Sequence, residues 1–424
     1  MSENVHNSAS ERLRDTASGF FQDYGLAFVM VASVVGSGSI FVASTVGIRY
    51  GYSLIWGFAA AALIGIMAQD MSARLGIFGV PLGTFMRQKF GQRIATALGV
   101  VLSIGVFLWV IELTAATAKG LSVLLGGVIG WQPLSVIVTI AAILVGLLNY
   151  DSLERVLTAL LFVLLGAYLL VAGVSSPSII DVAAGVVPTL PGGALTLLAS
   201  VIGSTAIWAN FFLESNLIEE KNWTDADDVS TMRKDLVLGY SIALILIVSV
   251  LVVSAAVLRP AGYENLRSFI TPGRALIEVM GRWAAVLFLV GASAAAFNSI
   301  MPIMWTVAYM FENIRGRDVD SADRSFKRIY AAGTALGVLA PVINLATGMT
   351  VVEMIVLFAS YSGIVSLPIT AVLLFWAVND QTVMGEHTND LKTNIVNVIL
   401  VVLSFILAGL SLPSLLKTLT SGGL

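Results

Sequence analysis

The chain has 424 residues, of which 57% are hydrophobic and only 12% are charged, with a formal net charge of -3. This composition excludes an ordinary soluble domain and indicates a membrane protein with several spans. The chain has no cysteine, and both histidines, His6 and His387, lie outside the apolar segments. A disulfide framework, a thiolate or histidine metal site in the membrane, and a nucleophile–histidine–acid catalytic set are therefore excluded, so we expect no enzyme activity.

Apolar segments long enough to cross a bilayer follow one another along most of the chain. They lie at about 24–47, 53–74, 94–126, 133–150, 155–174, 194–218, 235–258, 281–312, 329–347, 351–378 and 393–416. The sequence therefore predicts an all-α integral membrane protein with eleven transmembrane helices. Residues 1–22 are polar and are predicted to form a cytoplasmic tail, followed by one transmembrane domain at 23–418.

Lysine and arginine residues fix the predicted orientation. With the N-terminus inside, sixteen of the 23 lie on the inner side, six lie on the outer side, and Lys119 lies within a span. Because positive charge is retained on the cytoplasmic side, we expect the N-terminus in the cytoplasm and the C-terminus outside, in the cell (inner) membrane. At the inner end of the second span, Asp70 and Arg74 are four residues apart and are predicted to form an ion pair.

Two apolar segments carry small residues at mid-span, five helices apart. The residues are Gly36, Ser37, Gly38 and Ser39 in the first segment, and Gly203, Ser204 and Thr205 in the sixth. Such residues are poor helix formers, and a broken helix within the membrane is tolerated where it lines a cavity. Close helix packing by small residues is the alternative.

Breaks five helices apart are typical of five-plus-five inverted repeats, with the substrate between the breaks. We predict repeats at about 23–174 and 194–378 and an extra helix at about 393–416. The predicted substrate-binding residues are Gly36, Ser37, Gly38, Ser39, Gly203, Ser204, Thr205, Ile207, Trp208, Ala209 and Asn210. Trp208 is expected either to stack on an organic substrate or to pack in the core. The predicted function is secondary transport, since the chain has no P-loop motif for ATP use.

Three stretches resemble the Nramp family of metal-ion transporters. They are Gly47-Ile48-Arg49-Tyr50-Gly51-Tyr52-Ser53-Leu54-Ile55-Trp56, then Gln69-Asp70-Met71-Ser72-Ala73-Arg74-Leu75-Gly76, and the run from Asn210 to Lys221. The pair Ile111-Glu112 is also similar to an A-E pair of that family. The resemblance implies the eleven-helix fold with discontinuous helices 1 and 6 shared with leucine-transporter-type proteins, alternating access, metal-ion transport and proton-linked uptake.

By the same resemblance, the family's metal-binding D-P-G-N falls on Gly36–Ser39 and its M-P-H falls on Ile207–Ala209. The usual metal ligands are then replaced, which argues against classical manganese or iron transport, and no metal ligand is predicted. A hydrated Mg²⁺ stays compatible, because magnesium keeps several of its waters. The alternative substrate is a small carboxylate or amino-acid-like solute, since free N–H groups at the start of a half-helix favour an anion.

Three charged residues lie within predicted spans, where charge is costly and usually functional. Glu112, Lys119 and Glu214 are therefore the candidates for proton or ion coupling. Lys119 and Glu214 are alternatively a static ion pair between the third and sixth helices. The expected partners are a small solute, which is a metal ion or an organic acid, together with protons and the lipid bilayer. No cofactor and no nucleic acid are expected, and a monomer is the starting hypothesis.

Overall fold

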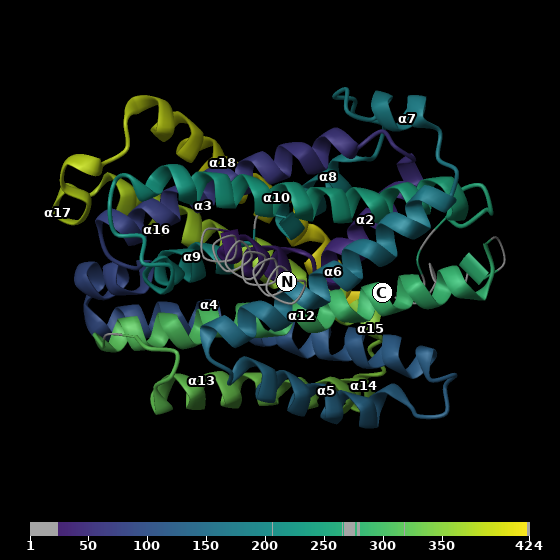
Figure 1. Cartoon of the computed structure of the whole chain (residues 1–424), viewed down its shortest axis with the longest axis horizontal. Coiled ribbons are helices and arrows are strands. Elements are labelled where there is room, and N and C mark those ends of the chain that lie inside the picture. The colour runs from purple at the N-terminus through teal and green to yellow at the C-terminus, as the bar shows by residue number, and fades with distance from the viewer. Residues whose placement is uncertain are drawn as a thin grey trace, which may run out of the picture.

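The computed structural model describes residues 24–421, apart from 206, 265, 267–275, 278–279 and 318. The described residues form helices and connecting segments, without a strand among them. Figure 1 shows the long helices lying side by side along the longest axis of the molecule. The all-helical prediction is therefore confirmed.

The long helices form the body of the molecule, and shorter ones connect or interrupt them. The α-helices after the first are α2 (Ser37–Tyr50), α3 (Ile55–Phe78), α4 (Leu82–Leu124), α5 (Trp131–Gly146), α6 (Tyr150–Val174), α7 (Ile179–Ala184), α8 (Leu195–Thr205), α9 (Trp208–Glu220), α10 (Asp228–Val253), α12 (Arg282–Arg315), α13 (Arg324–Thr334), α14 (Leu339–Thr347), α15 (Val351–Tyr361), α16 (Leu367–Asn379), α17 (Gln381–Met384) and α18 (Leu391–Ser421). Four short π or 3-10 turns are η1 (Ser254–Leu258), η2 (Ala335–Val338), η3 (Ser362–Ser366) and η4 (Gly385–His387).

Every predicted apolar segment contains helix, but the number of membrane crossings stays a prediction. Within the described residues, eight helices are long and apolar enough to cross a membrane, and a bent pair adds a ninth. Of the remaining two segments, α5 has only 16 residues, and the sixth segment is interrupted between α8 and α9.

The first span is broken, as the sequence predicts. The helix Tyr24–Val34 and α2 meet at an angle of 66°. The break lies at Val35 and Gly36, whereas the prediction placed it across Gly36–Ser39; Ser37, Gly38 and Ser39 form the first turn of α2. Gly36 is the N-cap, with an extended backbone of φ -108° and ψ -169°. Small hydroxyl residues are compatible with a first helical turn, so the prediction of a break at Ser37–Ser39 was wrong by a few residues.

The second break is also displaced along the chain. Gly203, Ser204 and Thr205 are the last residues of α8 rather than the interruption itself. Helix α9 begins at Trp208, after Ile207 in an extended conformation of φ -75° and ψ 116°. Both breaks therefore lie next to the predicted small residues, because these residues end or start half-helices instead of unwinding them.

Two local irregularities were not predicted. Helix α4 begins at Leu82, about three turns before the predicted start, and bends at Gly91, whose φ of 72° is readily adopted only by glycine. The π-helical turn η3 interrupts the span between α15 and α16. At the centre of the bundle, α12 packs against α4, α6 and α9, and this packing fixes the elements that surround the two breaks.

Candidate functional site

The start of α2 is tied to α4 by a buried carboxyl group. The Ser37 hydroxyl donates a hydrogen bond of 2.7 Å to Oε2 of Glu112. Both residues are buried, with exposed fractions of 0% and 3%. Because the N-terminus of a helix carries partial positive charge and unpaired N–H groups, the carboxyl group of Glu112 lies where it opposes that charge. The predicted residues Ser37 and Glu112 are thus brought together at the first break.

The two breaks are joined to each other by hydrogen bonds. The Ser39 hydroxyl, in the first turn of α2, contacts the carbonyl oxygen of Ser204 at 3.1 Å. The Ser33 hydroxyl, one turn before the break, donates to Oδ1 of Asn210 at 2.6 Å. The predicted residues of the two discontinuous helices therefore meet in the interior of the protein.

Open space adjoins both half-helices at their broken ends. A Cβ atom added at Gly38 or at Gly203 would meet no atom of the described chain within 4 Å. By contrast, a Cβ atom at Gly36 would lie 3.0 Å from Oγ of Ser299 on α12. Gly38 and Gly203 are therefore not packed against another element, whereas glycine at 36 is needed for close packing against α12.

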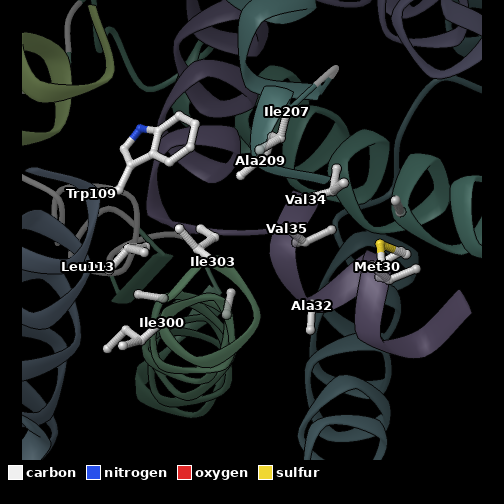
Figure 2. Close-up of a cluster of buried hydrophobic side chains, with 14 of the residues drawn as sticks. Met30, Ala32, Val34, Val35, Trp109, Leu113, Ile207, Ala209, Ile300 and Ile303 are labelled. Atoms are coloured by element: carbon white, nitrogen blue, oxygen red, sulfur yellow. The ribbon is translucent and has the colours of Figure 1, made fainter. Parts of the chain in front are cut away.

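The rest of the site is apolar. Figure 2 shows the side chains of Val34, Val35 and Ile207 near the breaks, with Ile300 and Ile303 of α12 and Trp109 of α4 facing the same region. The rings of Trp109 and Trp208 stack at 6.0 Å between centroids. Trp208 is 1% exposed, which favours the packing role that the sequence analysis left open.

Several predicted site residues do not present their polar atoms to the break. The Thr205 hydroxyl donates to the carbonyl of Val201 in its own helix at 2.9 Å. The carbonyl of Ala209 accepts a bond from Thr306 at 3.3 Å, and the carbonyl of Ile207 accepts one from the N–H of Asn210. The polar atoms available at the site are thus fewer than the sequence suggests.

The alternative that Lys119 and Glu214 form a static ion pair is not found among the described residues. Glu214 on α9 is fully buried, and neither of its carboxylate oxygens has a hydrogen-bond partner in the described chain. Lys119 on α4 is partly exposed and belongs to none of the ion pairs found among the described residues. Position in sequence gave no information on which faces of the two helices carry these charges.

Sequence reasoning missed three partners of the broken helices. Ser33 bonds to Asn210, Ser299 donates to the carbonyl of Ala32 at 2.6 Å, and Asp235 on α10 accepts from the backbone N–H of Ala27 at 3.0 Å. A lone serine within an apolar run carries little signal. Asp235 was detectable, since it is an acid at the start of a predicted span.

Within the described ranges, no group of three histidine or acidic side chains could hold a metal ion.

Comparisons with known proteins show which proteins this chain is similar to. Residues 27–414 match the model of the family described as Natural resistance-associated macrophage protein-like. The chain belongs to the Nramp family. Two similar relatives are divalent metal cation transporters MntH, from Deinococcus radiodurans (29% identity over 60% of each chain) and from Staphylococcus saprophyticus (22% identity over 95% of this chain and 93% of the relative). The first alignment spans only 60% of that relative's length.

Solved structures show the same overall fold. The manganese transporter of Eremococcus coleocola matches with a TM-score of 0.80 and 19% identity, covering 94% of this chain and 88% of that chain. Mhp1, a nucleobase-cation-symport-1 family transporter, matches with a TM-score of 0.65 and 15% identity, covering 93% of each chain. The predicted fold type of leucine-transporter proteins is therefore confirmed, whereas the repeat boundaries and the orientation of the termini stay predictions.

The inner end of this Nramp protein, in the predicted orientation, contains a second polar region. A cavity of about 490 Å³ is lined by Asn216, Glu219 and Glu220 of α9, together with Asn313 of α12. The side-chain amide of Asn313 donates to Asn216 at 2.7 Å. Because Asn216 lies less than two helical turns beyond Asn210, α9 connects the break with this cavity.

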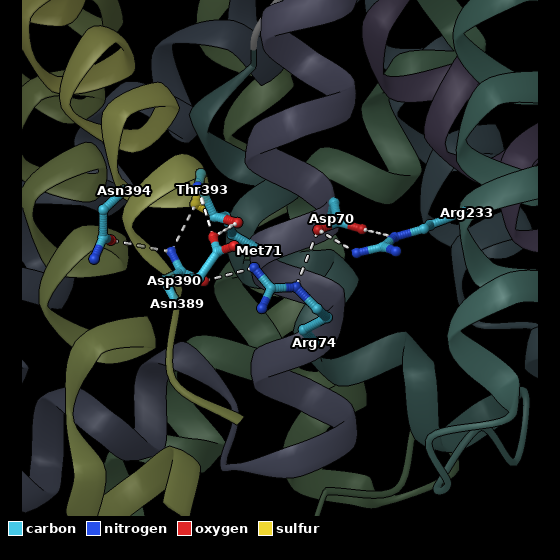
Figure 3. A network of polar contacts seen from close by, with 8 residues as sticks. All are labelled: Asp70, Met71, Arg74, Arg233, Asn389, Asp390, Thr393 and Asn394. Atoms are coloured by element: carbon cyan, nitrogen blue, oxygen red, sulfur yellow. Dashed lines mark hydrogen bonds and ion pairs between the residues drawn. The ribbon is translucent and has the colours of Figure 1, made fainter. Parts of the chain in front are cut away.

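The same end is held together by the network in Figure 3. Asp70 of α3 accepts from Arg74 at 3.0 Å, as predicted, and from Arg233 of α10 at 2.6 Å. Arg74 also donates to Asn389, which precedes α18, at 2.6 Å. The network therefore joins α3 to α10 on one side and to the segment before α18 on the other.

Proposed function

We propose that this chain is a secondary transporter that moves a divalent metal cation across the cell (inner) membrane by alternating access, with its substrate between the two helix breaks. The meeting of the two discontinuous helices carries the proposal, since the Ser39–Ser204 contact brings the breaks together at the bundle interior. In transporters with broken helices, such points coordinate ions and small solutes. The printed names of the relatives, divalent metal cation transporter, support the cation class.

Glu112 favours a cation over an organic anion. A substrate carboxylate would need the positive end of α2, but the carboxyl group of Glu112 already lies there, bonded to Ser37 at 2.7 Å. If Glu112 is ionised, a substrate carboxylate meets like charge in an apolar surrounding, which is unfavourable. If Glu112 is protonated, its carboxyl group still lies at the start of α2, bonded to Ser37. The small carboxylate or amino-acid-like solute therefore becomes the less favoured candidate, and it serves as the competing outcome of the test.

The polar atoms near the breaks suit a hard cation. They are hydroxyl, amide and carboxyl oxygens, from Ser37, Ser39, Asn210 and Glu112. Oxygen ligands match Mg²⁺, Mn²⁺ and Ca²⁺ better than softer metals. With one carboxyl group at hand, the cation keeps part of its water shell, as magnesium usually does. The predicted replacement of the family's usual metal ligands stays a prediction, and it implies a selectivity different from that of the named relatives.

Proton coupling belongs to the proposal through Glu112. A carboxyl group bonded to the first turn of α2 is placed to exchange its proton for the incoming cation. Such an exchange keeps the net charge of the apolar site low, which is favourable where dielectric screening is weak. Lys119, which is partly exposed, takes no part in the proposed exchange.

The test is uptake of Mn²⁺ or Mg²⁺ into liposomes containing the purified protein, with and without a proton gradient. We expect cation uptake that falls at least tenfold in Glu112→Gln and is unchanged in Glu353→Gln, a matched substitution at the first turn of α15. Thermal unfolding supplies a second measure, because a ligand at a hundredfold excess over its Kd stabilises the folded state by about 2.7 kcal/mol. Stabilisation by amino or organic acids, with no effect of divalent cations, would contradict the proposal.

A further inference from the structure

Two buried carboxyl groups outside the break region lack the partners that a charge requires. Glu214 of α9 and Asp235 of α10 are both 0% exposed. Neither oxygen of Glu214 and only one oxygen of Asp235 has a hydrogen-bond partner in the described chain. An uncompensated carboxylate is strongly disfavoured in a protein interior, so three unpaired acid oxygens here call for a ligand that supplies positive charge or donors.

Two further polar side chains around this acid pair are also unpaired. Oε1 of Gln69 on α3 and the hydroxyl of Tyr240 on α10 are buried without a hydrogen-bond partner. Tyr240 is near enough to Glu214 to interact with it electrostatically. Gln69 and Tyr240 also line a small cavity of about 10 Å³ beside the helix Tyr24–Val34. That space is at the lower limit for a single water molecule, and neither Glu214 nor Asp235 lines it.

Lys221, the positively charged residue near the acid pair, already forms an ion pair with another acid. Lys221 contacts Glu154 of α6 at 3.4 Å and lies 5.7 Å from the ring centre of Tyr150. Asp235 interacts with both Lys221 and Glu154 at longer range, and these two contributions oppose each other. The acid pair therefore cannot rely on Lys221 to balance two negative charges.

Asp235 also supports the helix Tyr24–Val34, the first half of the broken span. Asp235 accepts the backbone N–H of Ala27 at 3.0 Å. A Cβ atom added at Gly239, one turn further along α10, would lie 3.2 Å from Ala27. A Cβ atom at Gly25 would collide with the carboxyl group of Glu154. The helix Tyr24–Val34 thus rests closely on polar groups of α6 and α10, and a change of charge there acts directly on it.

We infer that Glu214 and Asp235 form a proton-binding site whose occupancy controls how firmly the helix Tyr24–Val34 is held against α10. One proton from bulk water binds a carboxylate oxygen of the pair, and it returns to water when the site empties. With Asp235 charged, its bond to the N–H of Ala27 is charge-assisted and about twice as strong as a neutral one. A proton on Asp235 weakens that bond and releases the half-helix. The role in transport rests on the proposed function, but proton binding itself does not.

Infrared spectroscopy of the purified chain, in detergent and without divalent cations, tests the proton site. We expect an absorption of a protonated carboxyl group above pH 5, where exposed acids are ionised. Glu214→Gln should remove the part of this absorption that belongs to the acid pair, and the part that belongs to Glu112 should remain. Glu214→Asp should retain both parts, and Glu353→Gln should leave them unchanged. An unchanged absorption in Glu214→Gln would overturn the inference. If the purified protein shows the absorption of the acid pair but transports no divalent cation, only the proposed function is refuted.

Hydrogen exchange at one fixed pH tests the coupling to the half-helix. Asp235→Asn keeps an oxygen for the N–H of Ala27 but removes its charge, so peptides covering residues 24–34 should exchange at least tenfold faster than in the wild type. Equal exchange in the two proteins would overturn the coupling. Stabilisation by sodium but not choline at equal ionic strength, abolished in Glu214→Gln, would also overturn the inference, because the site would then hold a sodium ion.

Discussion

Glycine at position 38 is the most direct handle on the proposed site. It lies in the first turn of α2 with open space at its Cβ position, and its backbone is not in the left-handed region. Gly38→Ala should therefore fold without strain. Since alanine is favoured over glycine in a helix interior by up to about 1 kcal/mol, the free energy of unfolding should rise slightly or stay unchanged.

A larger side chain at the same position should separate stability from transport. Gly38→Leu places four carbon atoms in the space beside the break, where the substrate is proposed to bind. We expect cation uptake into liposomes to fall at least tenfold, which corresponds to about 1.4 kcal/mol in the rate-limiting free energy. The added Cβ lies in open space, so the melting temperature of the variant shows whether the rest of the leucine side chain also fits without a loss of stability.

The matched control is Gly166→Leu on α6. A Cβ atom at Gly166 also meets no described atom within 4 Å, but this residue is exposed on the outside of the bundle. It should leave both uptake and stability unchanged. Wild-type uptake by Gly38→Leu would refute the location of the substrate path, and a loss of more than 1 kcal/mol in Gly38→Ala would show that the space is not free.

Three further predictions concern packing and charge. The Lys89 ammonium group, hydrogen-bonded to Asp380, holds the pKa of that carboxyl group below its usual value. Lys89→Met should therefore lower the free energy of unfolding by about 0.2–1 kcal/mol at neutral pH. Thermal unfolding should show this difference vanish as the pH falls through the range in which the Asp380 carboxyl group titrates. Lys221→Met leaves the buried Glu154 unpaired and should cost about 3–5 kcal/mol, whereas adding Glu154→Leu should recover most of the loss in denaturant unfolding. Gly47→Ala should cost about 1–3 kcal/mol, because the new Cβ would approach a backbone carbonyl oxygen of α10 to 2.4 Å; an unchanged melting temperature would contradict this.

The positions of the helices could be predicted because membrane spans have a strong local signal. Around 20 apolar residues are needed to cross the bilayer, and every predicted segment contains helix. The two breaks were located to within a few residues, since glycine and small hydroxyl residues seldom occur together in a span without a reason. Their exact limits were not predictable, because Ser37 and Thr205 fit a helix end as well as a break.

Side-chain partners depended on the tertiary structure. Periodicity does not define which face of a helix is buried when the whole helix is apolar, as the failed pairing of Lys119 with Glu214 illustrates. Helix rotation decides instead that Glu112 meets Ser37 and that Asp235 meets Ala27, 208 positions away in sequence. The sequence by itself determined the membrane class, the helix order and the approximate breaks, because each depends on local composition. Only the packing of α9, α10 and α12 around the first helix decided which acids lie together, because such contacts join residues far apart in the chain.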